Sequence, residues 1–415
     1  MLISRRRLLA VSGSGIAIGA AAAVTNGLAY AQDAATPVTT DLAEAVIEIA
    51  KRSLSDLNLK SVIVRVTIDS QELVTAAFGE STSGVPATTD MHFRNGSVAI
   101  SYVATLLLRF VDQKLIGLDD TIDAWLPDLP DSNRVTLRML ANMTSGYPDY
   151  VQQADFIAAC YADPFRQWLP DELIEYGVGK PRVFEPGANW DYAHTNYVIL
   201  GLALEKIGGQ PMDQMLREQI LDPLGLTNTV SSSTPAISEP VLHSYSSERR
   251  GLLGIPDGTR FYEDSTFWNP SWTITHGAIQ TTNIYDMTAS AEAVGTGALL
   301  SPESHLAQIE PRLVGFGALL DGCPTCHPLT PQFNYGLGVF INGPWLFQNP
   351  FFSGYGAIAA YLPSKRIAIA VATTPGEAAF DDNGDLIGGG NLSMPIYREI
   401  GEMLAPDEAP PATGS

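Results

Sequence analysis

The chain has 415 residues, of which 45% are apolar and 17% are charged, a balance typical of a globular protein with one large domain or two ordinary ones. This composition suggests neither an intrinsically disordered chain nor a membrane protein. The 45 acidic and 24 basic residues give a formal net charge of −21, which argues against binding of nucleic acid or anionic lipid through a general electrostatic field.

The first 31 residues predict a twin-arginine export signal. Three consecutive arginines, Arg5 to Arg7, precede an apolar run rich in glycine and alanine, and residues 29–31 have the Ala-x-Ala pattern of a cleavage site before Gln32. Cleavage leaves 21 basic and 45 acidic residues, a net charge of −24. We therefore expect a periplasmic or extracellular protein without a stable membrane anchor. The alternative is a retained N-terminal anchor, which the short apolar core disfavours.

After a polar linker over residues 32–41, the chain is strand-rich at both ends and helical between them. The expected elements are a helix over 42–54, strands over 62–68 and 73–78, a helix after 97, a helix ended by Pro127, helices within 136–229, short strands over 335–341, 357–362 and 366–372, and a last helix over 394–404. We assign little structure to 230–275 and expect 406–415 to be disordered. This order predicts an α+β domain over 42–405, with one antiparallel sheet from N- and C-terminal segments, flanking helices, and a helical insert over about 119–270.

Ser97 follows the flexible pair Asn95-Gly96 and precedes apolar residues at helical spacing. It therefore stands where an N-cap or first-turn residue belongs. Unpaired backbone N–H groups converge at this end of a helix, so the position suits a nucleophile whose product is an oxyanion. It suits an ordinary capping serine equally well.

Three cysteines occur, Cys160, Cys323 and Cys326, and the last two form Cys-Pro-Thr-Cys followed by His327. In an exported protein we predict a local disulfide between Cys323 and Cys326. Haem attachment and a metal site are alternatives for the same run. The surrounding glycine and proline residues indicate a loop without a haem-sized domain, so we expect no cofactor and no metal.

Several short motifs follow one another between about residues 40 and 405. They are Phe93-Arg94-Asn95-Gly96-Ser97, Leu118-Asp119-Asp120, Trp125-Leu126-Pro127, Met143-Thr144-Ser145-Gly146-Tyr147-Pro148-Asp149, Phe184-Glu185-Pro186-Gly187, the run from Tyr192 to Gly201, Asp222-Pro223-Leu224-Gly225-Leu226 and Tyr335-Gly336-Leu337-Gly338. In this order they resemble the penicillin-recognising serine hydrolases, which include class C β-lactamases, D-alanyl-D-alanine carboxypeptidases and related esterases. The resemblance implies a β-lactamase/transpeptidase-like fold and serine acyl-transfer chemistry.

In that family the chemistry depends on Ser-x-x-Lys, on Tyr-x-Asn, and on Lys/His-x-Gly in an edge strand. The corresponding segments here are Ser97-Val98-Ala99-Ile100, Tyr192-Ala193-His194 and Gln348-Asn349-Pro350. The resemblance makes Ser97 and Tyr192 catalytic positions, with His194 in place of the amide and Ile100 in place of the lysine. It makes Gln348, Asn349 and Phe351 substrate-binding positions. We expect Pro350 to remove one N–H from the strand that a peptide-like substrate would pair with, although Phe351 could still offer its own.

Without the lysine, Tyr192 is a poor base, because at its usual pKa near 10 only about one part in a thousand is phenolate at pH 7. Loss of a well-placed base typically forfeits about 10²- to 10⁴-fold in rate. We therefore expect a catalytically degenerate family member whose cleft still binds a partner or a ligand, the ligand being a small molecule, a peptide or an ester. The alternative is an active esterase or peptidase in which His194 serves Ser97 as base beside Tyr192. A further question is whether Arg182 or Arg260 replaces the missing lysine in space.

Overall fold

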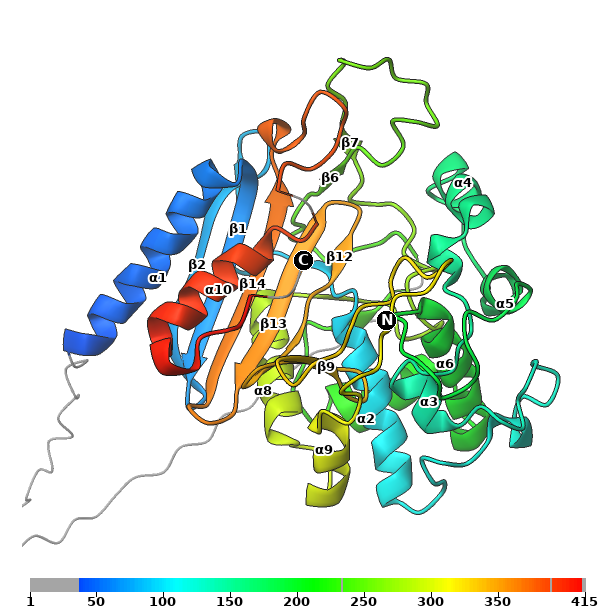
Figure 1. The fold of residues 1–415 in the computed structure, drawn as a ribbon. Coiled ribbons are helices and arrows are strands. Elements are labelled where there is room, and N and C mark those ends of the chain that lie inside the picture. The colour runs from blue at the N-terminus through cyan, green and yellow to red at the C-terminus, as the bar shows by residue number, and fades with distance from the viewer. Residues whose placement is uncertain (1–36, 233, 389, 413–415) are drawn as a thin grey trace, which may run out of the picture.

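The computed structural model describes residues 37–412, except residues 233 and 389 (Figure 1). The expected export signal over 1–31 lies outside these residues. The α-helices are α1 (Pro37–Asp56), α2 (Val98–Asp112), α3 (Leu137–Ala141), α4 (Ala154–Ala162), α5 (Pro170–Val178), α6 (His194–Gly208), α7 (Met212–Leu216), α8 (Ile284–Thr296), α9 (Pro302–Ile309) and α10 (Ser393–Leu404). Within the described residues, none of the helices combines the length and the apolar content needed to cross a bilayer.

One antiparallel sheet joins the two ends of the chain (Figure 1). Its order is β3-β2-β1-β14-β13-β11-β10-β9, and β12 pairs with β13. The strands are β1 (Leu59–Ile68), β2 (Gln71–Thr82), β3 (Val85–Pro86), β9 (Phe333–Tyr335), β10 (Phe340–Asn342), β11 (Trp345–Gln348), β12 (Phe351–Phe352), β13 (Tyr355–Leu362) and β14 (Ile367–Pro375). The pairing of β1 with β14 confirms the predicted α+β fold with a sheet built from both terminal segments.

Helices cover this sheet and explain its apolar strands. The helices α1 and α10 contact each other and the sheet, whereas α8 packs against β1, β13 and β14 (Figure 1). Every residue of β13 and β14 is buried, so these two strands read in the sequence as nearly continuous apolar runs. Apolar burial of this extent is the main source of the stability of the sheet.

The helix α2 runs between the sheet and the inserted helices. It contacts α6, α7, α8 and α9, and all its residues from Val98 to Leu108 are buried. The loop before β10 approaches it closely at Gly338, which has φ +72°, and a Cβ there would lie 2.6 Å from the Cβ of Ala104. The start of α2 is therefore held rigidly in the centre of the molecule.

The structure corrects two details of the expected elements. Residues 406–412 are ordered, since Pro406–Glu408 forms a 3₁₀ helix and Trp345 Nε1 donates a hydrogen bond to the carbonyl of Glu408 (2.8 Å). The Pro/Ala-rich composition of the tail gives no sign that the indole of Trp345 needs the carbonyl of Glu408 as its acceptor. The segment before Pro127 is a 3₁₀ turn over Ile122–Ala124 and not an α-helix. In the weakly assigned region 230–275, leaving aside residue 233, the strands have two residues each: β5 (Val230–Ser231), β6 (Tyr245–Ser246) and β7 (Glu263–Asp264).

Candidate active site

Ser97 occupies the N-cap position of α2, but its hydroxyl does not cap the helix. The residue has φ −62° and ψ −11°, and its side chain forms no capping hydrogen bond. Instead Ser97 Oγ accepts a hydrogen bond from Tyr192 Oη at 3.2 Å. The capping role that the sequence allowed is therefore wrong, and the hydroxyl is directed at another candidate site residue.

Tyr192 lies two residues before the start of α6 and is fixed by aromatic neighbours. Its ring stacks on Phe340 (5.7 Å between centroids, 13° between planes) and meets Tyr335 edge-on at 6.2 Å. Burial raises the pKa of Tyr192 to about 12, partly offset by the hydrogen bond with Ser97. At neutral pH the phenol is therefore protonated and acts as a donor toward the serine.

The position of the family lysine is part of the core. Ile100 is 2% exposed, one turn into α2, and its carbonyl oxygen lies 3.0 Å from where a Cβ on Gly338 would be. Neither arginine considered as a substitute lies at Ser97. Arg182 donates to Asp131 Oδ2 and to the carbonyl of Ser145, each at 2.7 Å, and Arg260 lies 4.0 Å from Asp382.

His194 has an acidic partner that the sequence did not identify. The backbone N–H of His194 donates to Asp149 Oδ1 (3.1 Å), and its ring Nδ1 lies 3.2 Å from Asp149 Oδ2. Asp149 is 3% exposed and also accepts from the N–H of Val151. The imidazole meets the ring of Tyr192 edge-on at 5.5 Å, and among the described residues it bonds to Asp149 and not to Ser97. The one sequence signal that could have pointed to Asp149 is its place at the end of a matched motif, Met143 to Asp149.

In the segment that corresponds to the third family motif, the side chain of Gln348 does not lie where the sequence predicted. Its side chain is 3% exposed and donates from Nε2 to the carbonyl of Gly338 (2.6 Å), so it supports the loop beside α2. The prediction of a substrate-binding Gln348 is wrong because its side chain points into the core from β11. Asn349 is half-buried, and its carbonyl accepts from Asn391 Nδ2 (3.2 Å). Phe351 is 44% exposed.

Pro350 lies directly beside the serine loop. Its Cβ is 2.5 Å from where a Cβ on Gly96 would be, and Gly96 has φ +51°, so this contact requires glycine. The carbonyl of Pro350 accepts from the N–H of Ala357 in β13 at 2.9 Å. Since the N and O of one strand residue face the same side, the N–H that proline lacks would have faced β13.

The N–H of the next residue, Phe351, is unaffected by this proline. Successive residues of a strand direct their polar groups to opposite sides, so the N–H of Phe351 points away from β13. The N–H of Ser97 belongs to the orphan donors at the start of α2. The N–H that Pro350 lacks would have faced the sheet, and the N–H of Phe351, which was expected to remain for a substrate, is on the other side.

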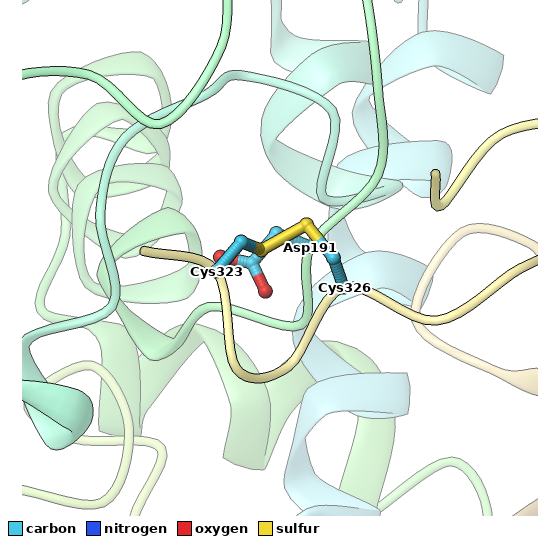
Figure 2. A group of neighbouring side chains, drawn as sticks. All are labelled: Asp191, Cys323 and Cys326. Atoms are coloured by element: carbon cyan, nitrogen blue, oxygen red, sulfur yellow. A yellow bond between two sulfur atoms is a disulfide. The ribbon is translucent and has the colours of Figure 1, made fainter. Parts of the chain in front are cut away.

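The predicted disulfide is present between Cys323 and Cys326, with 5.3 Å between their Cα atoms. It packs against Asp191, the residue before Tyr192 (Figure 2). Thr325 Oγ1 donates to Asp191 Oδ1 at 2.6 Å. Burial raises the pKa of Asp191 to about 6. Both sulfurs are bonded to each other, so neither is free for the thioether bonds of an attached haem.

Comparisons with known proteins identify the family of this chain. A profile of the family described as Beta-lactamase matches residues 45–388. Penicillin-binding protein 4* of Bacillus subtilis (strain 168) is 30% identical over 152 residues, which cover 37% of this chain and 33% of that protein. Penicillin-binding protein 4 of Amycolatopsis lactamdurans is 31% identical over 194 residues, covering 43% and 46%. The chain thus spans a third to a half of the length of these curated relatives.

Solved structures share the fold. The crystal structure of a D-stereospecific amidohydrolase from Streptomyces sp. superposes with a TM-score of 0.69 and 23% identity, covering 83% of this chain and 96% of that chain.

Proposed function

Because this chain belongs to the beta-lactamase family, we propose that it is a member that has lost efficient acyl transfer and uses its cleft to bind a ligand. The observation that carries the proposal is Ile100, an apolar core residue one turn after Ser97 where the family's chemistry needs an ammonium.

The contacts of Ser97 support loss of activation. A nucleophilic serine must give its proton to a base as it attacks. The one hydroxyl group that reaches Ser97 belongs to Tyr192, which donates its own proton. The arginines considered as replacements are engaged elsewhere. Among the described residues, no cation contributes to the pKa of Tyr192. A loss of about 10²- to 10⁴-fold in acyl-transfer rate is expected from the missing base.

The retained parts of the site favour a ligand with a carbonyl or carboxylate group. The N–H groups of Ser97 and Phe351 are the proposed donors to such a ligand, and the side chains of Tyr192 and His194 are partly exposed. The matched relatives are named penicillin-binding proteins, and a structural neighbour is a D-stereospecific amidohydrolase. We therefore propose peptides, β-lactams or esters as the ligand class, bound outside the cytoplasm after export through the signal at residues 1–31.

The test separates binding from chemistry. The protein is incubated with a fluorescent penicillin and with a fluorophosphonate, and adducts are sought by intact mass. Thermal unfolding is recorded with and without penicillin or a diacylated Lys-D-Ala-D-Ala peptide. We expect an increase in the unfolding temperature with at least one ligand and no adduct on Ser97. Rapid adduct formation that Ser97→Ala abolishes would contradict the proposal.

A second candidate is an active serine esterase or peptidase with Ser97, Tyr192 and His194. The contact between Asp149 and the His194 ring favours it, since a carboxylate that orients an imidazole makes it a better base. In that case both Asp149→Asn and His194→Asn would lower the kcat for a p-nitrophenyl ester by about 10²-fold or more. Equal rates in these variants and the parent protein exclude this mechanism.

A further inference from the structure

The Cys323–Cys326 turn and Asp191 bring three metal-binding groups together. The two Sγ atoms and a carboxylate oxygen of Asp191 all lie within 4.8 Å of one another. Figure 2 shows the carboxylate beside the two sulfurs. The turn lies between α9 and β9, whereas Asp191 precedes α6, so the fold and not the local sequence assembles this group.

We propose that this group is a zinc site that becomes available when the disulfide is reduced. Two thiolates in Cys-x-x-Cys spacing form half of many structural zinc sites, and carboxylate oxygen is a third accepted ligand. Zinc prefers four ligands in a tetrahedron, so a water molecule completes the set. Soft thiolate donors favour zinc over magnesium or calcium.

The surroundings resemble the support that ligands of a metal usually have. Asp191, Cys323 and Cys326 are 4%, 6% and 4% exposed. The Thr325 hydroxyl donates to Asp191 Oδ1, and the Asn189 side-chain amide lies 3.8 Å from Cys326 Sγ as a donor. Such outer hydrogen bonds orient the ligands and stabilise thiolates.

The disulfide and the zinc site exclude each other. A dithiol reductant breaks the S–S bond by two exchange steps, which yield two cysteine thiols and the cyclic disulfide of the reductant. Zn²⁺ then displaces the two thiol protons to solvent and binds the thiolates together with the Asp191 carboxylate. The charge of −3 on the bare ligands falls to −1, which makes their burial less costly.

The segment before α6 is tied to the loop before β9 by hydrogen bonds. Asn189 Oδ1 accepts from the N–H groups of Gly317 and Ala318, and Asp191 directly precedes Tyr192. The disulfide closes a turn within that loop, whereas zinc would add a bond between the loop and Asp191.

The experiment uses the full chain, reduced with dithiothreitol and freed of reductant under anaerobic conditions. Titration with Zn²⁺ against a chromophoric chelator is expected to show one tightly bound zinc per reduced chain, and at least about tenfold weaker binding by the oxidised chain. Zinc-edge X-ray absorption should show two sulfur neighbours at about 2.3 Å and oxygen neighbours at about 2.0–2.2 Å. Cys323→Ser and Asp191→Asn should each weaken binding at least about tenfold, whereas Cys160→Ala, the matched control, should not.

Several results would overturn the assignment. Binding of half a zinc per chain, or four sulfur neighbours, would indicate a thiolate complex between chains. Affinity unchanged by Asp191→Asn would exclude the carboxylate. If His327→Ala weakened zinc binding as much as Cys323→Ser, the third zinc ligand would be the imidazole and not the Asp191 carboxylate. The X-ray absorption of the unsubstituted chain decides the ligand set even if a variant fails to fold.

Discussion

Replacing Ile100 by lysine puts an ammonium one helical turn after Ser97, and its cost follows from burial. Ile100 is 2% exposed, so the variant loses about 1.5–3 kcal/mol of apolar burial. An unpaired charge at such a site costs about 3–5 kcal/mol. We expect a folded but clearly destabilised protein, measured by chemical denaturation.

The gain is a rate. If the nucleophile and the backbone donors of the cleft are intact, a restored base raises fluorophosphonate labelling of Ser97 by about 10²- to 10⁴-fold. His194→Asn is added in a second variant, because it returns the Tyr-x-Asn element of the family to its usual form. Labelling is followed by gel fluorescence, and the adduct is located by peptide mass spectrometry.

The matched control is Ile100→Met, which keeps an apolar side chain and costs less than about 1.5 kcal/mol. It should not change the labelling rate, and Ile100→Lys with Ser97→Ala should not label at all. The reasoning is refuted if the folded double variant labels no faster than the parent protein. In that case the strand beside Pro350 would not supply the inferred donor.

Three further predictions concern the core. Burial raises the pKa of the Cys160 thiol to about 12, so at pH 8 about one part in 10⁴ is thiolate. Iodoacetamide should therefore alkylate the native protein about 10³-fold more slowly than the unfolded chain. Fast alkylation of the native protein would contradict this. Gly338→Ala should lower the free energy of unfolding by about 2–5 kcal/mol, because of left-handed strain and overpacking against α2. Gly209 also has a left-handed backbone (φ +67°) but open space around it, so Gly209→Ala should lower that free energy by only about 1–2 kcal/mol. Equal losses in the denaturation midpoints of the two variants would refute the close approach at Gly338. Deleting residues 406–415 leaves the Trp345 indole without its acceptor, which should cost about 1–3 kcal/mol and shift tryptophan emission to the red; unchanged emission would show that the tail does not cover it.

Much of the fold followed from sequence periodicity and the collinear motifs. The runs over 62–68 and 366–372 were apolar because both become central strands, and β1 and β14 indeed pair side by side. The serine and tyrosine came from the motifs, and the structure places their hydroxyls 3.2 Å apart. The ends of the helices were predicted less accurately. The helix α1, for example, begins at Pro37, before the expected helix over 42–54.

The remaining contacts depend on the tertiary fold. Asp149 lies 45 residues before His194, and no spacing rule links a loop carboxylate to an imidazole at a helix start. Gln348 was assigned to the cleft from its motif position, but a strand residue faces the core or the cleft according to its register. The role of Pro350 likewise required the pairing of its carbonyl with β13.

The central claim is that Ser97 is kept in place but is no longer activated. Its most direct test is the steady-state hydrolysis of p-nitrophenyl butyrate by the parent protein and by Ser97→Ala, at equal concentration and neutral pH. If no base activates the Ser97 hydroxyl, as we propose, both proteins hydrolyse the ester at the same slow rate. A parent rate about tenfold or more above that of Ser97→Ala would contradict it.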